Sequence, residues 1–488
     1  MRVSLNIAYR LGRWVLRAAL GFYFARIERF HGERVPATGP VLFTSNHPNS
    51  VADAFVIGTS VPRKVNFVAT VRLFQIAPIR WLLTQCGVIA INRVKDDARA
   101  MRTVRDSFEA CYRVLEKGEA VGIFPEGITH DDPQLKSVKT GAARMALELE
   151  HRHGGKLGLQ LVPVGLTFSA KERYRSEVLV NFGEPIRAAA FLDGYPERKH
   201  DCIRTLTGEM EHRIETLILH VPKLEQARVI EAVKRLYLDR LFVGNRVIHE
   251  PVPPRVGELL LTQAIARAVE FTCEHQPERA TDFVTRLDQY ERRLKRLNLS
   301  DAELESLKLQ TDRDPVLFSH ASPALFPTTG SLIGRSLVWA VPGVLLFPVA
   351  AYGWVHRLLP IMIVDWAIQR FAETSTNRTR VTTTALLAGI LSFGPWYGLL
   401  IALCHAILGW PVSLIYGLSL PVAGLVAHYY ARGAHRFAAA VRSTLVMIRA
   451  PIAAHRLLRM REALIAQIQA ARWEVPAQAL TSDPVKSQ

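Results

Sequence analysis

The chain has 488 residues, enough for two or three domains, and 49% of them are hydrophobic. Its net charge of +17 indicates an anionic partner, either a nucleic acid or a membrane surface. The sequence has no zinc motif and no dense basic run with interleaved aromatic residues, which argues against nucleic-acid binding. Its five cysteines lack CxxC or other metal-binding spacing, which indicates structural thiols in a reducing compartment.

Residues 1–30 are expected to form a basic amphipathic helix that lies in a membrane interface. Arg10, Arg13 and Arg17 recur at helical spacing, and apolar residues cover much of the remaining surface. We expect these arginines to face anionic headgroups. The longest uncharged run after them, Ala18–Ala25, is too short to span a bilayer. An ordinary packing helix is the alternative.

Residues 31–220 alternate strand-like and helical segments, a pattern that predicts an α/β domain with a mostly parallel sheet. The predicted strands are Val41–Thr44, Val65–Thr70, Val88–Ile91, Val121–Phe124, Gln160–Leu166 and Val178–Phe182. Helical periodicity lies between them, for example at 98–116 and 140–151. Residues 221–330 are then expected to form a charged helical region that ends in a proline-containing linker at 314–329.

Residues 331–431 are predicted to be a membrane region. No charged residue occurs from Val381 to Ala431, and this block is long enough for two spans. We expect the spans at about 382–404 and 411–431, joined by a tight turn.

The distribution of arginines predicts the topology of this region. A loop at 356–380 and the tail at 432–488 are both rich in Arg, so the positive-inside rule places both in the cytoplasm. The uncharged run 336–355 is interrupted by Pro342 and Pro348. With cytoplasmic sequence on both sides, this run is expected to be a re-entrant or interfacial segment rather than a single crossing.

The first candidate site lies directly after the strand predicted at 41–44. Pro48 disfavours helical geometry for the residue before it, so His47 belongs to a loop. Asp53 falls in the first turns of the next helix, and its side chain tilts back towards that loop. The spacing therefore predicts a His–Asp pair in which Asp53 supports His47 as a general base. Taken alone, a structural loop histidine is the simpler interpretation.

Three further segments contain residues suited to binding. Arg93 follows a strand, where a guanidinium suits a phosphate, although a surface ion pair is favoured when this residue is taken alone. In Phe124-Pro125-Glu126-Gly127, a tight turn would let a ligand approach the backbone at Gly127, while Glu126 could hold an Arg or accept a substrate hydroxyl. A plain turn is the alternative. Pro163 lies inside an apolar strand and indicates an edge, a bulge or a kink.

In their order and spacing, these four segments resemble the four motif blocks of the glycerolipid acyltransferase family, the lysophospholipid and glycerol-3-phosphate acyltransferases. The resemblance covers about residues 38–190, and Phe124-Pro125-Glu126-Gly127 is its most specific part. It implies that His47 and Asp53 are catalytic. It also implies that Arg93, Glu126, Gly127 and Lys139 bind a phosphate-bearing acceptor, and that neither a metal nor a tightly bound cofactor is needed.

Five residues separate His47 from Asp53, whereas the common family form has four. The longer gap is similar to the fungal-type glycerol-3-phosphate and dihydroxyacetone-phosphate acyltransferases and their bacterial relatives. The same branch continues its third block with Thr129-His130-Asp131, then Leu135, Lys139 and Gly141, as here.

The resemblance implies transfer of a fatty acyl group from acyl-CoA or acyl carrier protein to glycerol 3-phosphate or dihydroxyacetone phosphate, in phosphatidic acid synthesis. Acylation of lysophosphatidic acid and a non-catalytic, lipid-binding membrane scaffold are the alternatives. The expected protein is integral to an anionic membrane and has a cytoplasmic active site. That membrane is the inner membrane in a bacterium or the endoplasmic reticulum in a eukaryote.

Overall fold

The computed structural model describes residues 7–75, 77–91, 100–243, 252–305, 329–372 and 378–474. The chain divides into two compact units. The first comprises Met1–Leu224, Glu250–Leu260 and Asp365–Ile390, and the second comprises Glu225–His249, Leu261–Val364 and Leu391–Gln488. Each unit is described by itself. Arg93 and the predicted linker at 314–329, apart from its last residue, lie outside the described residues.

An eight-stranded sheet forms the centre of the first unit, in the order β1-β7-β6-β2-β5-β3-β4, with β8 also paired to β6. The strands are β1 (Arg26–Phe30), β2 (Val41–Ser45), β3 (Val65–Thr70), β4 (Ile89–Ile91), β5 (Ala120–Ile123), β6 (Gln160–Phe168), β7 (Glu177–Phe182) and β8 (Ile186–Arg187). The block from β6 to β4 is parallel throughout, whereas β7 and β8 run antiparallel to β6. The predicted α/β class with a mostly parallel sheet is confirmed.

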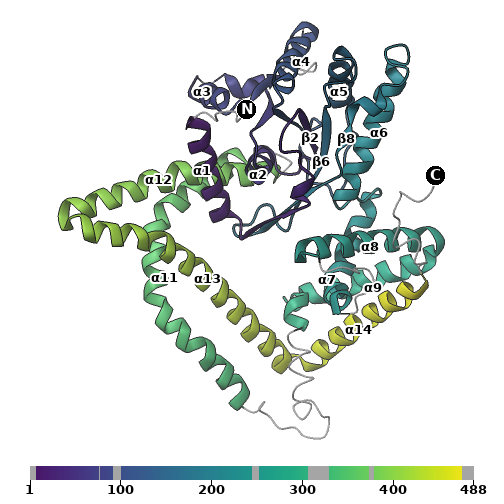
Figure 1. Cartoon of the computed structure of the whole chain (residues 1–488). Coiled ribbons are helices and arrows are strands. Elements are labelled where there is room, and N and C mark those ends of the chain that lie inside the picture. The colour runs from purple at the N-terminus through teal and green to yellow at the C-terminus, as the bar shows by residue number, and fades with distance from the viewer. Residues whose placement is uncertain are drawn as a thin grey trace. The chain divides into compact units, whose positions relative to one another are not determined.

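Helices cover this sheet (Figure 1). They are α1 (Ile7–Tyr23), α2 (Val51–Ser60), α3 (Ala77–Gln85), α4 (Ala100–Glu116), α5 (Gly141–Arg152) and α6 (Lys199–Leu217). One apolar core joins α4, α5 and α6 to the sheet, with Leu42, Val121 and Leu161 of β2, β5 and β6 completely buried within it. Burial of these aliphatic side chains is the main favourable contribution to stability in such a core.

The predicted helix over residues 1–30 is too long. Helix α1 ends at Tyr23, and Arg26–Phe30 form strand β1, which pairs in parallel with β7. The segment Arg-Ile-Glu-Arg-Phe is mostly charged, so no apolar alternation marked it as a strand. Its conformation depends on pairing with a strand about 150 residues further along the chain, which local sequence does not encode.

The orientation expected for Arg13 and Arg17 is also wrong. Arg13 donates through Nη2 to the carbonyl of Val61, and Arg17 donates to the carbonyl of Thr59, at 3.0 Å from Nη2. Both carbonyls lie at the C-terminal end of α2, where backbone oxygens lack helical partners and positive charge is favourable. These guanidinium groups therefore fasten α1 to α2 instead of facing headgroups.

Pro163 lies in a central strand, so the edge location offered by its sequence context is wrong. β6 pairs with β2 on one side. On the other side it pairs with β8 at Gln160–Leu161 and with β7 from Val164 onwards. Pro163 falls in the gap between these two partners, where a residue without an N–H breaks no ladder on that side.

The second unit is helical, as expected for most of 221–330. Helices α7 (Ala227–Val243), α9 (Pro277–Arg296) and α14 (Pro451–Glu474) pack together, and α8 (Pro254–His275) continues into this unit from the first. Arg235 and Arg228 of α7 both pair with Glu291 of α9, at 2.9 and 2.8 Å. Such paired charges at the helix contact agree with the highly charged sequence of this region.

Among the described residues, three helices are long and apolar enough to cross a membrane: Gly343–Phe371 within α11 (Thr329–Phe371), α12 (Val381–Leu408), and Trp410–Ser443 within α13 (Trp410–Arg449). The turn between α12 and α13 is a single residue, Gly409, with φ of 77°.

Helix α11 runs without a break through Pro342 and Pro348, so the interruption expected at these prolines does not occur. Prolines in apolar helices are tolerated where neighbouring groups satisfy the freed carbonyl. The number of crossings stays a prediction.

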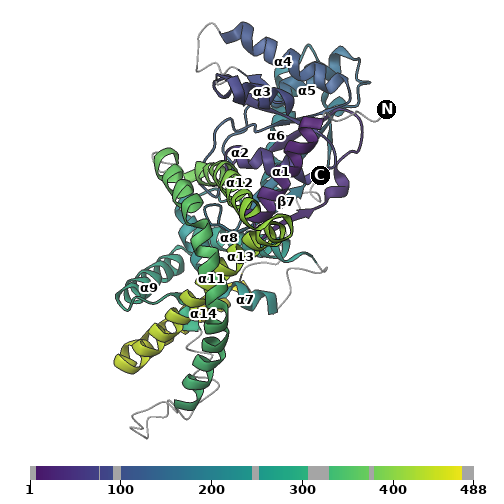
Figure 2. The same cartoon turned by 90° about the vertical axis from the view of Figure 1, so that its left-hand side faces the viewer.

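Close packing between small residues joins α11 to α13. A Cβ on Gly353 would overlap the backbone of Ala423, so only glycine allows this approach. Beside this contact, the Tyr352 hydroxyl lies 2.8 Å from that of Ser419. Arg357 donates to the carbonyl of Gly424 at 3.0 Å. Figure 2 shows α11 and α13 crossing side by side, as they also do in Figure 1.

Candidate active site

The candidate residues gather where parallel strands of the sheet end. β2 lies between β5 and β6 in the parallel block, so the carboxyl ends of these three strands meet at one edge. The loop with His47 follows β2, the turn with Glu126 follows β5, and Lys171 follows β6. In open α/β sheets this edge is the usual place for ligands.

His47 and Asp53 form the predicted pair. The ring Nδ1 of His47 lies 2.9 Å from Oδ2 of Asp53, and that oxygen also accepts the backbone N–H of Asn49 at 2.8 Å. Ser50, the residue before α2, has φ of 53°, and this turn folds the loop back over the helix N-terminus. The five-residue gap is thus compatible with a direct hydrogen bond between the two side chains.

The pair has the polarity that a general base needs. The carboxylate can only accept, so Nδ1 carries the ring hydrogen and Nε2 is the nitrogen available to take a proton. The side chain of Asp53 is fully buried, while that of His47 is 17% exposed. Burial raises the pKa of the Asp53 carboxyl, and the hydrogen bonds from His47 and Asn49 oppose this effect. A buried carboxylate beside a partly exposed imidazole suits transfer of a proton at the ring's outer edge.

An aromatic stack fixes the plane of the imidazole. The Phe124 ring lies parallel to that of His47, with centroids 3.9 Å apart and planes 12° apart. Phe67 continues the stack behind Phe124, with centroids 6.1 Å apart. A flat aromatic face against the imidazole limits its rotation and favours the positively charged form that arises during catalysis. This role of Phe124 was not predicted.

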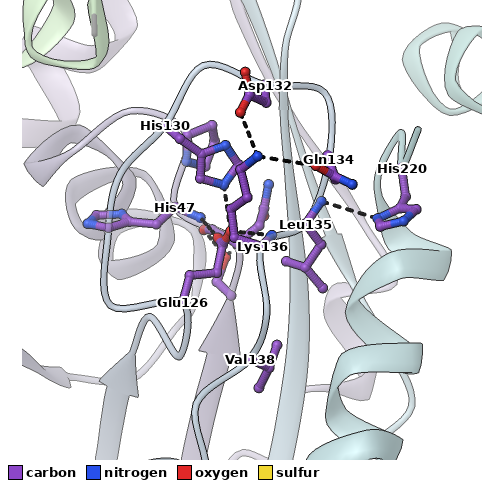
Figure 3. Close-up of polar contacts among 12 residues, drawn as sticks. His47, Glu126, His130, Asp132, Gln134, Leu135, Lys136, Val138 and His220 are labelled. Carbon is purple, nitrogen blue, oxygen red and sulfur yellow. Dashed lines mark hydrogen bonds and ion pairs between the residues drawn. The ribbon is translucent and has the colours of Figure 1, made fainter. Parts of the chain in front are cut away.

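Glu126 connects the third motif block to the first. Its Oε1 accepts the backbone N–H of His47 at 2.8 Å, while Oε2 accepts from His130 Nε2 at 2.5 Å and from the backbone N–H of Lys136 at 2.9 Å. Figure 3 shows the backbone of His47 next to Glu126 and its imidazole pointing away. Since both oxygens are engaged with the protein, Glu126 positions the loop in this structure. Its contact with substrate stays a prediction.

Gly127 and Lys139 lie against each other. Gly127 has φ of +66° and donates its N–H to the carbonyl of Phe124 at 3.0 Å, which forms the expected tight turn. A Cβ at this position would overlap the ammonium group of Lys139. The backbone N–H of Lys139 in turn bonds the carbonyl of Pro125 at 3.0 Å, and the residue is exposed. The structure thus holds a cation directly over the turn after β5.

Two residues that sequence reasoning missed hold the His47 loop from the β6 side. The Asn46 side chain bonds both the N–H and the C=O of Leu166, at 2.8 and 3.0 Å. Lys171 donates to the carbonyl of Pro48 at 2.9 Å and pairs with Asp131. Asn46 stands next to His47 in sequence, so its position was a signal, whereas nothing in the local sequence connects Lys171 to this loop.

Comparison with known families identifies the domain. A family model described as Acyltransferase matches residues 28–167, which include the His47–Asp53 pair and the Glu126 turn. Residues 28–167 form an acyltransferase-family domain. The match agrees with the resemblance seen at about residues 38–190 and with the sheet that carries the site.

Related proteins agree with this assignment. A Schizosaccharomyces pombe protein described as an uncharacterized acyltransferase is 30% identical over 214 residues, 40% of this chain and 28% of the relative. Glycerol-3-phosphate O-acyltransferase 1 of Saccharomyces cerevisiae is 26% identical over 429 residues, 70% of this chain and 54% of the relative. Human 1-acyl-sn-glycerol-3-phosphate acyltransferase beta is 28% identical over 137 residues, 28% of this chain and 48% of the relative. The chain thus spans about half or less of these relatives.

Proposed function

We propose that this chain is a membrane-bound O-acyltransferase that transfers a fatty acyl group from a thioester to a hydroxyl of glycerol 3-phosphate or dihydroxyacetone phosphate. The hydrogen bond between His47 and Asp53 carries the proposal, since it leaves Nε2 of a partly exposed imidazole to act as a base. The surrounding domain belongs to the acyltransferase family. Acyl-CoA and acyl carrier protein are both suitable thioester donors.

The chemistry follows from the pair. Nε2 of His47 takes the proton of the acceptor hydroxyl while its oxygen forms a bond to the thioester carbonyl carbon. Asp53 stabilises the imidazolium that results. As the tetrahedral intermediate collapses, the C–S bond breaks, and the leaving sulfur receives the proton from His47. The products are the ester and the free thiol, and no covalent acyl-enzyme is required.

The acceptor is expected to be small and to carry a phosphate. The exposed Lys139 lies over the Gly127 turn. Arg93, which the sequence motif contributes, lies outside the described residues. Both side chains suit a phosphate group. The yeast glycerol-3-phosphate O-acyltransferase aligns with 70% of this chain, and the human 1-acyl-sn-glycerol-3-phosphate acyltransferase beta aligns with 28%. This difference in coverage favours glycerol 3-phosphate as the acceptor. Acylation of lysophosphatidic acid is the second candidate.

We also propose that the active site faces the cytoplasm, at the bacterial inner membrane or the endoplasmic reticulum. The three long apolar helices support membrane association. The arginines around α12 and α13 support the orientation through the positive-inside rule. The net charge of +17 suits an anionic lipid surface.

The test uses purified full-length protein with labelled acyl-CoA. Glycerol 3-phosphate, dihydroxyacetone phosphate and lysophosphatidic acid are offered in parallel, with acyl carrier protein thioester as the alternative donor. We expect turnover with one of the first two acceptors, and a loss of about 10²–10⁴-fold or more in His47→Ala. Lipid binding without turnover would favour the scaffold, and a folded His47→Ala variant with normal turnover would refute the mechanism.

A further inference from the structure

The helix that carries Asp53 lacks an N-terminal cap of its own. Helix α2 begins at Val51, and Ser50 before it makes no side-chain cap hydrogen bond. The backbone N–H of Ala52, in the first turn, is instead accepted by the hydroxyl of Thr383 at 3.1 Å. Thr383 lies 331 residues further along the chain, in the first turn of α12. The first turn of α2 is thus capped by a distant helix.

The same threonine contacts the loop itself. Thr383 donates its hydroxyl hydrogen towards the carbonyl of Asn49 at 3.5 Å, so one side chain bridges the end of the His47 loop and the start of α2. The backbone N–H of Asn49 bonds Asp53, which in turn holds His47. Displacement of Thr383 would therefore shift Asn49, the residue whose N–H fixes the carboxylate of the pair.

Thr382, the preceding residue, supports this arrangement through a second path. Its hydroxyl donates to the carbonyl of Lys171. Lys171 holds the carbonyl of Pro48, at 2.9 Å from its ammonium nitrogen. The two adjacent threonines thus support two consecutive peptides of the loop, at Pro48 and Asn49.

Burial shows that the start of α12 is part of the catalytic unit. Thr382 is fully buried and Thr383 is 8% exposed, and the first ten residues of α12 belong to the first unit. Further along the same helix large apolar side chains are exposed, with Leu387 at 44% and Leu391 at 74%. The whole of α12, Val381–Leu408, is long and apolar enough to cross a membrane. The first turn of this candidate span therefore contacts the active-site loop.

We propose that Thr383 is a positioning residue for His47, and that the first turn of this membrane helix completes the active site. The inference rests on the proposed function, in which His47 is the general base. Thr383 bonds the backbone of Asn49 and Ala52, and Asn49 in turn bonds Asp53. Thr383 is therefore expected to act on His47 indirectly, through these residues. Its loss should lower kcat and leave substrate affinity intact, since a misplaced catalytic group slows the chemical step.

The experiment compares variants of the full-length protein in the acyl-transfer assay. Thr383→Val keeps the branched shape and removes the hydroxyl, whereas Thr383→Ser keeps the hydroxyl. We expect Thr383→Val to lower kcat about ten-fold or more with both KM values within about two-fold of wild type. Thr383→Ser should restore most of kcat. Thr384→Val, the half-buried neighbour, is the matched control and should behave as wild type.

His47→Ala measured alongside separates the two proposals. If His47→Ala is inactive while Thr383→Val keeps a normal kcat, the positioning role is refuted and the proposed function stands. If His47→Ala retains normal turnover, the general-base role of His47 in the proposed function fails, and the positioning role of Thr383 fails with it. Should Thr383→Val not fold, Thr383→Cys replaces it, because a thiol is a weak hydrogen-bonding group of similar size. A normal kcat in Thr383→Cys, or a loss in Thr383→Ser equal to that in Thr383→Val, would also refute the inference.

Discussion

Phe124 lies flat against the imidazole of His47, with ring centroids 3.9 Å apart. The hydrogen bond from Nδ1 to Asp53 lies in the plane of the imidazole, so the stack and the hydrogen bond restrain the ring in different directions. Together they leave the ring little freedom, and they present Nε2 in a fixed direction. Preorganisation of this kind lowers the cost of reaching the transition state.

Phe124→Leu should therefore lower kcat with little change in folding. A contact between a cation and an aromatic face is worth about 0.5–2 kcal/mol, which corresponds to roughly 2- to 30-fold in rate. Leucine fills a similar apolar volume without the flat face. The measurement is kcat with thermal unfolding as the control, and Phe124→Tyr, which keeps the ring, should stay close to wild type. Equal rates in all three proteins would show that the stack is irrelevant to catalysis.

Asp53→Asn should separate stability from activity. Burial raises the pKa of the Asp53 carboxyl in the folded protein. At a pH above this raised pKa, the buried carboxylate is ionised and lowers the free energy of unfolding. The neutral amide avoids this cost and keeps an oxygen that can accept the N–H of Asn49. The variant should unfold at a temperature equal to or above that of wild type at neutral pH. The difference should shrink as the pH falls through the raised pKa.

Activity should change in the opposite direction. An amide cannot support the imidazolium, so kcat should fall by about 10²–10⁴-fold. Turnover and unfolding temperature are measured on the same preparations across the pH range. A variant that unfolds well below wild type at neutral pH would contradict the assigned cost of the buried carboxylate, and normal turnover would contradict its catalytic role.

The His47–Asp53 pair could be predicted because its determinants are local. A proline after the histidine and a helix that starts before the aspartate bring two side chains together within seven residues. Glu126 and Gly127 were likewise placed in a turn at the end of a strand. The order of the strands then brings the two segments to one edge, which is a property of parallel sheets rather than of either segment.

The supports of the pair could not be predicted, because they come from distant parts of the chain. Thr383 and Lys171 are ordinary polar residues whose roles arise only when α12 and the end of β6 are folded against the loop. Arg13 and Arg17 showed helical periodicity that suits a membrane face equally well as a protein face. Only the carbonyls at the end of α2 decide between these two orientations.

Lys139→Gln should weaken acceptor binding. The ammonium group lies over the Gly127 turn beside the His47 loop, where a phosphate on the acceptor can reach it. A hydrogen bond to a charged group is worth about 1.5–3 kcal/mol, so KM for glycerol 3-phosphate should rise roughly 10- to 150-fold. KM for the acyl thioester should change little. Lys136→Gln is the control, because Lys136 pairs with Asp132 at 2.6 Å. Equal changes in both KM values would indicate a structural role for Lys139.

Gly127→Ala provides an independent check of the same arrangement. The added methyl group would overlap the ammonium of Lys139, and the positive φ of Gly127 is unfavourable for alanine. Displacement of Lys139 should raise KM for glycerol 3-phosphate as Lys139→Gln does. The double variant should then be no worse than the more severe single one. Fully additive losses would show that the two residues act separately.

Helix α1 should lie in the membrane interface with its outer face in contact with lipid. Ile7, Leu11 and Trp14 are 81%, 60% and 67% exposed and share one helical stripe, while Arg13 and Arg17 lie outside that stripe and hold the helix to α2. A spin label at Leu11, in protein reconstituted into liposomes, should be more accessible to oxygen than to a polar nickel reagent. A label at Val61, which is buried beside Arg13, should be inaccessible to both. Greater accessibility of the Leu11 label to nickel would show that α1 faces water.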